Sequence, residues 1–190
     1  SFFGVRSGEG MVSGSHNFFA GMYISRLPNA SGSHNIAIGC VASRNLSSGA
    51  HNITLGNSAG YCIGTGTCNI VLGKSAGYNV TTGYENVIIG NEAGKCGVSI
   101  ANNVFIGRYS GKKFCGGDNN VAIGKESLCG SSTIANNYGP HNIAIGYATG
   151  SEMSTGEKNV IMGIESAKAL STGSRNVYIG CGAGDCRQSG

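Results

Sequence analysis

Tryptophan is absent from this chain of 190 residues, proline occurs only twice, and charged residues make up 12% of the total. Scarce proline, and glycine without a three-residue period, exclude collagen. No apolar run approaches the roughly 18 residues that a membrane-spanning helix needs. A hydrophobic content of 40% with a net charge of +4 excludes a disordered chain. The 13 scattered lysines and arginines do not indicate nucleic-acid binding.

Glycine, by contrast, is abundant, with 34 residues. Its positions reveal a repeat, Asn-aliphatic-x-aliphatic-Gly, which is clearest at Asn35–Gly39 and Asn52–Gly56. Successive repeat asparagines are usually 17 residues apart, with one extra residue before Asn35 and five before Asn142. The full set after a degenerate copy at Asn17 is Asn35, Asn52, Asn69, Asn86, Asn103, Asn120, Asn142, Asn159 and Asn176.

The repeat predicts one strand per unit, because apolar and β-branched residues alternate between glycines that permit tight corners with positive φ. Seventeen residues are too few for a helical-pair repeat. We therefore expect a single all-β domain over residues 1–190, a β-solenoid of about eleven coils with an insertion at 130–140. The repeat asparagines are expected to form a structural ladder, each bonded to its equivalents in neighbouring coils.

The two aliphatic residues of each strand are expected to point into the coil and the middle residue outward. This outward column is apolar with a single threonine, which favours a protein–protein contact over an ice-binding surface. The chain also opens and closes inside a repeat without a polar cap, so we expect lateral or end-to-end self-association, or a segment of a longer fibre. The predicted outward column is Phe19, Ala37, Thr54, Val71, Ile88, Phe105, Ala122, Ala144, Ile161 and Tyr178.

The units Asn120–Gly124 and Asn142–Gly146 resemble the head repeats of trimeric autotransporter adhesins (YadA-like heads). Similar repeats occur in fibre proteins of phages, algal viruses and predatory bacteria. The resemblance covers nearly the whole chain at the level of the repeat. It implies a left-handed β-roll, often trimeric, that projects from a cell or particle surface. The longer repeat and the eight cysteines of this chain depart from those heads.

The eight cysteines contain no CxxC motif, which excludes zinc-ribbon and thioredoxin-like sites. Their even number and their positions, mostly outside the strands, favour an oxidising, extracellular setting. Candidate disulfides are Cys96 with Cys115 between coils, and Cys62 with Cys68 and Cys181 with Cys186 within coils. Cys40 and Cys129 are then left over and are candidates for links between chains, unless the other pairings are wrong.

Three sequons on predicted turns, at Asn29, Asn45 and Asn79, are candidate glycosylation sites. The histidines all precede a repeat asparagine, and His16, His34 and His51 lie in consecutive coils, where their rings could stack and bind a transition metal. A solvent-facing corner is the simpler interpretation of that column. No catalytic constellation is visible, and neither a cofactor nor an enzymatic activity is expected.

These observations favour a non-enzymatic extracellular structural protein, a subunit or segment of a self-associating fibre with a surface-adhesion role. Its main partner would be itself, laterally as a trimer or end to end, with no membrane span and no nucleic acid. The alternative is a fibre head that binds a receptor protein or a cell-surface glycan. Such a head needs a defined surface site, for which the insertion Gly130–Pro140 with Tyr138 is the candidate.

Overall fold

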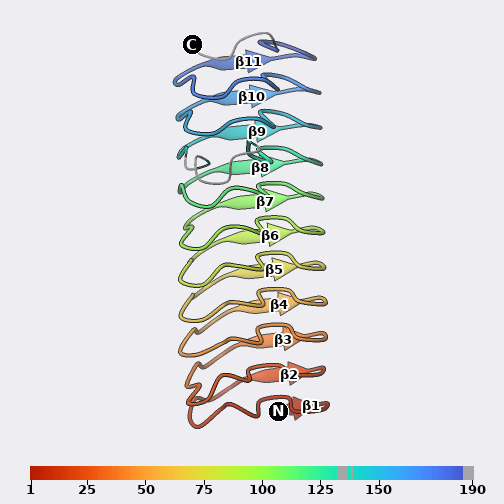
Figure 1. The fold of residues 1–190 in the computed structure, drawn as a ribbon, viewed down its shortest axis with the longest axis vertical. Helices are drawn as coiled ribbons and strands as arrows, with labels where there is room; N and C mark the ends of the chain where they lie inside the picture. The colour runs from red at the N-terminus through yellow and green to blue at the C-terminus, as the bar shows by residue number, and fades with distance from the viewer. Residues whose placement is uncertain (132–136, 138, 186–190) are drawn as a thin grey trace.

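The computed structural model describes residues 1–131, 137 and 139–185. These residues form a rod of stacked coils, with β1 at one end and β11 at the other (Figure 1). The described chain contains no helix, and so none that could cross a membrane. The strands are β1 (Phe2–Phe3), β2 (Phe18–Ala20), β3 (Ile36–Ile38), β4 (Ile53–Leu55), β5 (Ile70–Leu72), β6 (Val87–Ile89), β7 (Val104–Ile106), β8 (Val121–Ile123), β9 (Ile143–Ile145), β10 (Val160–Met162) and β11 (Val177–Ile179).

All eleven strands belong to one parallel sheet whose strand order is the chain order, which confirms the predicted all-β solenoid. Ile53 pairs with Ile70, one repeat further on. Val121 pairs with Ile143, so the longer step between β8 and β9 leaves the register unchanged. Within the insertion, residues 132–136 and Tyr138 lie outside the described residues.

Backbone hydrogen bonds join the coils outside the strands as well. The N–H of Gly60 donates to the carbonyl of Ala76 and that of Cys62 to the carbonyl of Tyr78, both at 2.9 Å. These bonds lie in the segment that returns from the end of each strand to the start of the next, here called the return segment. A parallel ladder therefore continues through much of each coil and satisfies backbone groups that would otherwise be buried without partners.

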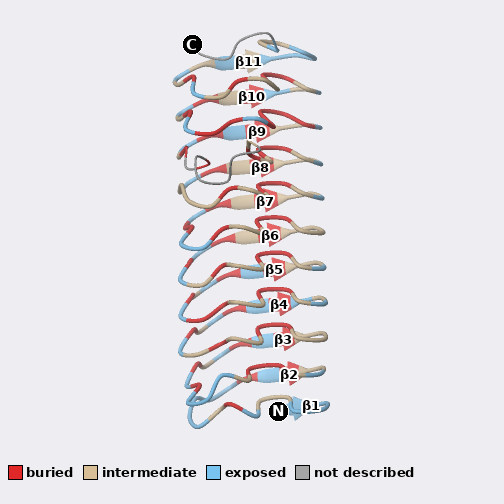
Figure 2. Cartoon of the chain, in the orientation of Figure 1, coloured by how far each residue is buried: buried red, intermediate tan, exposed pale blue. Residues whose placement is uncertain are grey.

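The strands face the opposite way from the sequence-based expectation. The middle residues of β2 to β10, such as Val71, Ile88 and Phe105, are fully buried. Their aliphatic neighbours on each side are half-buried or exposed, and the pattern recurs in coil after coil (Figure 2). The prediction of an outward middle column is therefore wrong. Both sides of these strands are apolar, so alternation identifies the strand but not its phase.

In many coils one large side chain from the return segment closes the interior. Val80 has this place in one coil, beside Gly83, where an added Cβ would lie 2.8 Å from a Val80 methyl group. In the next coil, Gly97 occupies the position of Val80 and Ile100 occupies the position of Gly83. A Cβ on Gly97 would lie 2.5 Å from the end of the Ile100 side chain. Most coils have a glycine three residues before the repeat asparagine, as Gly83 is before Asn86. Ile100 replaces that glycine before Asn103 because it fills the space left empty by Gly97.

The two glycine columns are needed for different reasons. Gly90, at the end of β6, has φ +134° and approaches the carbonyl oxygen of Gly107 so closely that a Cβ would lie 2.5 Å away. Gly66, in the column before the asparagines, has no positive φ but is as close to Gly83. At that corner the left-handed conformation is adopted by the residue before the asparagine, such as His34 at φ 60°. Glycine is needed in the column before the asparagines mainly because adjacent coils approach closely there, and less because of a positive φ.

Candidate functional surfaces

The first and third residues of β2 to β11 form one continuous apolar surface, here called the aliphatic face. Every one of these side chains is half-buried or exposed, and none is polar. The face consists of Phe18, Ala20, Ile36, Ile38, Ile53, Leu55, Ile70, Leu72, Val87, Ile89, Val104, Ile106, Val121, Ile123, Ile143, Ile145, Val160, Met162, Val177 and Ile179.

The area of the aliphatic face is that of the largest apolar patches on protein surfaces, which are often functional. Strands about 4.8 Å apart and residues about 3.3 Å apart give it a flat area of about 500 Å². Because its side chains project from the sheet, its accessible area is larger than this. Contiguous apolar patches above a few hundred Å² usually mark interaction sites.

The repeat asparagines form a hydrogen-bonded column on the inside of the corner before each strand. Asn69 is typical: its backbone N–H and its Nδ2 donate to Oδ1 of Asn52 at 3.1 and 3.0 Å, and Nδ2 also donates to the carbonyl of Gly83 at 2.8 Å. The column crosses the insertion, where the N–H of Asn142 donates to Oδ1 of Asn120 at 2.8 Å. With their amides buried and committed to these bonds, the asparagines have a structural role.

The histidines next to this column are exposed. The rings of His16 and His34 stack with centroids 4.7 Å apart, and those of His34 and His51 with centroids 4.8 Å apart. Cys68 continues the column as an exposed thiol. The part of the chain that is described nevertheless holds no group of three or more histidine, cysteine or acidic side chains arranged to bind a metal ion.

Seven cysteines lie among the described residues, and all seven are free thiols; Cys186 lies outside them. The Cys96 and Cys115 thiols, in adjacent coils, interact directly, and burial followed by this contact raises the pKa of Cys115 to about 11. Cys62 instead accepts a weak hydrogen bond from Nδ2 of Asn45 at 3.9 Å. Of the two predicted pairs whose cysteines are both described, Cys96 with Cys115 is the one that the fold brings into contact.

The remaining cysteines and the sequons are scattered. Cys40 is half-buried and Cys181 is exposed, in coils far apart along the rod. Of the sequon asparagines, Asn29 is exposed, whereas Asn45 and Asn79 are half-buried. Asn29 is the sequon asparagine most accessible to glycosylation.

A ladder of long side chains runs along the return segments at the fifth position after each strand glycine. The phenol rings of Tyr61 and Tyr78 stack with centroids 4.7 Å apart, and Nη1 of Arg44 donates to the Tyr61 hydroxyl at 2.6 Å. Lys95 and Lys112 follow and share Glu92, with N–O distances of 3.3 and 2.8 Å. The Lys112 ammonium lowers the pKa of Glu92.

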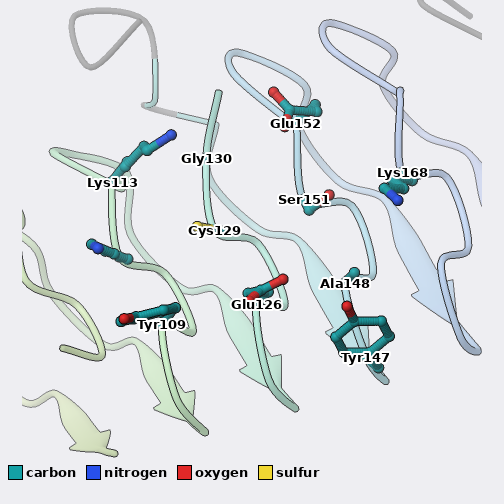
Figure 3. Close-up of a pocket in the computed structure, with 11 residues that line it drawn as sticks. Tyr109, Lys113, Glu126, Cys129, Gly130, Tyr147, Ala148, Ser151, Glu152 and Lys168 are labelled. Carbon is teal, nitrogen blue, oxygen red and sulfur yellow. The ribbon is translucent and has the colours of Figure 1, made fainter. Parts of the chain in front are cut away.

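This ladder is interrupted where the insertion joins the rod, and a pocket of about 340 Å³ lies in the gap (Figure 3). The two coils after Lys112 carry Cys129 and Ser151 at the ladder position, and Gly130 and Ala148 complete a floor of small residues. Burial raises the pKa of Cys129, so its thiol is uncharged at neutral pH. The floor of the pocket is therefore neutral.

Charged and aromatic side chains form the walls of the pocket. Lys112 and Lys168 are held by Glu92 at 2.8 Å and Glu165 at 2.9 Å. Two tyrosine rings flank the floor, each under a cation: Lys112 lies 4.2 Å from the Tyr109 ring centroid and Lys125 lies 5.2 Å from that of Tyr147. Lys113, Glu126 and Glu152 complete the walls.

Two of these charged groups have no ion-pair partner among the described residues, the Lys113 ammonium and the Glu152 carboxylate. Among the described residues, the ion pair of Glu126 is a long contact of 3.5 Å with Lys125. The mixture of charges is suited to a polar ligand.

Of the described residues of the insertion that the sequence indicated as a binding site, Gly130 alone lines this pocket. It is attached to the rod through Asn137, which is buried and whose Nδ2 donates to the Lys113 carbonyl at 3.0 Å. The sequence signal for the pocket itself is the change from long to short side chains at Cys129 and Ser151. That signal is visible only after the repeats are aligned.

Comparison with protein-family models, with characterised proteins and with solved structures finds no match to this chain.

Proposed function

We propose that this chain is a non-enzymatic structural protein that assembles laterally with copies of itself through the aliphatic face, as part of an extracellular fibre. The observation that carries the proposal is the aliphatic face itself. Twenty positions along ten strands contain no polar side chain, although solvent-facing strand positions usually accept threonine, lysine or glutamate.

A second copy is the partner that fits this surface best. The side chains of the face repeat about every 4.8 Å along the rod, and a surface with the same repeat can interdigitate with them over the full length. Two such faces in contact would bury about 1,000 Å² or more, the lower end of specific interfaces. A closed dimer or trimer would cover the face completely.

The extracellular placement belongs to the same proposal. It is supported by an even number of cysteines and by one pair of thiols in contact across a coil boundary. Disulfides persist in oxidising compartments, where a thin, glycine-rich coil benefits from covalent cross-links.

Sedimentation equilibrium at micromolar concentration tests the assembly. We expect the wild-type chain to be oligomeric and the double variant Ile70→Lys/Ile143→Lys, with two charges on the face, to be monomeric. The matched control is Val98→Lys/Ile164→Lys, which changes two apolar residues that are exposed by 48% and 56% but lie outside the strands, and which should remain oligomeric. Circular dichroism establishes that all three proteins are folded. A wild-type chain that is strictly monomeric would overturn the proposal.

A further inference from the structure

We propose that the pocket between Lys113 and Lys168 binds an acidic sugar, a pyranose carrying one carboxylate, as a unit of a surface glycan. This inference is independent of the lateral assembly, because the pocket lies on the return segments and the aliphatic face on the strands (Figure 3).

Short side chains at two successive positions of the ladder create a pocket with room for one monosaccharide unit. Cys129 and Ser151 replace the long side chains of the ladder in two successive coils, while Lys112 and Lys168 remain on either side. The cavity of about 340 Å³ is at the small end of the range for ligand sites. It is open to solvent, so a sugar that is part of a longer chain can enter it.

The Lys113 ammonium, which has no ion-pair partner among the described residues, is the reason to expect an anionic group on the ligand. Lys112 and Lys168 are held by Glu92 and Glu165, whereas Lys113 has no such partner among the described residues. A carboxylate that binds Lys113 would form a charge-assisted hydrogen bond in a partly desolvated site.

The two carboxylates of the pocket restrict the rest of the ligand. Glu126 and Glu152 are acceptors and would bind hydroxyl donors, but they would repel a phosphate with its two negative charges. The Ser151 hydroxyl, which forms no side-chain hydrogen bond with the described residues, adds a donor and acceptor at the floor. Cations lie over the Tyr109 and Tyr147 rings, and the ring edges offer apolar contacts to the C–H groups of a pyranose. One carboxylate surrounded by hydroxyl groups satisfies all of these side chains.

Titration of the folded chain with methyl glucuronide, followed by heteronuclear NMR, tests the proposal. We expect saturable shifts at Gly130, Ala148 and Ser151, with a dissociation constant on the order of 1 mM. The neutral twin, methyl glucoside, should bind at least tenfold more weakly, because it lacks the charge-assisted bond (about 1.5–3 kcal/mol). Inorganic phosphate should not compete.

Two variants distinguish binding at the pocket from a general effect of removing one positive charge. Lys113→Gln should weaken methyl glucuronide binding about tenfold, whereas Lys74→Gln, which removes an exposed lysine outside the pocket, should leave it unchanged. Equal binding of the charged and neutral sugars would overturn the acidic part of the proposal. Absence of shifts at the pocket residues up to 50-fold above the expected constant, in a chain with an otherwise unchanged spectrum, would overturn the site.

Discussion

The side-chain amide of Asn86 donates a hydrogen bond of 2.9 Å to Oδ1 of Asn69, and the backbone N–H of Asn86 donates to the same oxygen at 3.1 Å. Nδ2 of Asn86 also donates to the carbonyl of Ile100 at 2.7 Å. A single amide therefore connects three successive coils. No other side chain of similar size carries both the donor and the acceptor in this geometry.

Replacement of Asn86 by alanine should destabilise the rod substantially. The substitution removes the amide donor from Asn69 and the acceptor from Asn103, whose N–H donates to Asn86 Oδ1 at 3.0 Å. Buried groups without partners cost about 1–3 kcal/mol each, so we expect a loss of about 2–4 kcal/mol in the free energy of unfolding. Chemical denaturation followed by circular dichroism measures it.

Asn57→Ala is the control, because Asn57 is exposed and lies outside the asparagine column. Its effect should remain within about 0.5 kcal/mol, as for most surface substitutions. Equal losses of stability in the two variants would contradict a stabilising role of the asparagine column.

Replacement of Gly90 by alanine should also lower the stability of the rod substantially. A Cβ at Gly90 would lie 2.5 Å from the Gly107 carbonyl oxygen, and the backbone there has φ +134°. We expect Gly90→Ala to separate two coils and lower the melting temperature by several degrees or prevent folding. Thermal unfolding monitored by circular dichroism gives the shift.

Gly64→Ala provides the comparison, since a Cβ at that position would lie 3.5 Å from its nearest neighbours and no positive φ is involved. This variant should be neutral or slightly stabilising, because alanine reduces the entropy of the unfolded chain. A similar loss in both variants would show that glycine is required for some reason other than the approach of adjacent coils.

Oxidation should join Cys96 to Cys115. With glutathione disulfide as the oxidant, the two thiols give up two hydrogens to form one S–S bond, and two molecules of glutathione are released. The intact mass should fall by about 2 Da per bond, and a peptide that links the two segments should disappear on reduction. A disulfide that closes a loop of this length should raise the free energy of unfolding by about 3 kcal/mol.

The variant Cys115→Ser, which cannot form the bond, should show neither the linked peptide nor the stabilisation. Recovery of Cys62 linked to Cys68 in its place would contradict the contacts in the fold.

The period of the rod and the positions of β2 to β11 followed from the sequence, because an asparagine and a glycine four residues apart, such as Asn52 and Gly56, flank each of these strands. The phase of the strands did not. Val71 lies inside and Ile70 and Leu72 lie outside, yet all three are aliphatic, and no difference in polarity distinguishes the two sides. The pocket was missed for a related reason, because its signal is the small size of Cys129 and Ser151 relative to their counterparts in other coils. Size becomes informative only when the shape of the coil is known.

The in-register stacking of the coils has a kinetic consequence. Nearly every contact in the rod joins residues about one repeat apart, as Ile53 and Ile70 are, so the mean separation is about a tenth of the chain length, a relative contact order otherwise found in helical bundles. Each new coil closes a short loop onto a template that is already formed, and loop closure costs little more for the last coil than for the first. An all-β chain of this kind can fold quickly, from any nucleus of a few neighbouring coils outward.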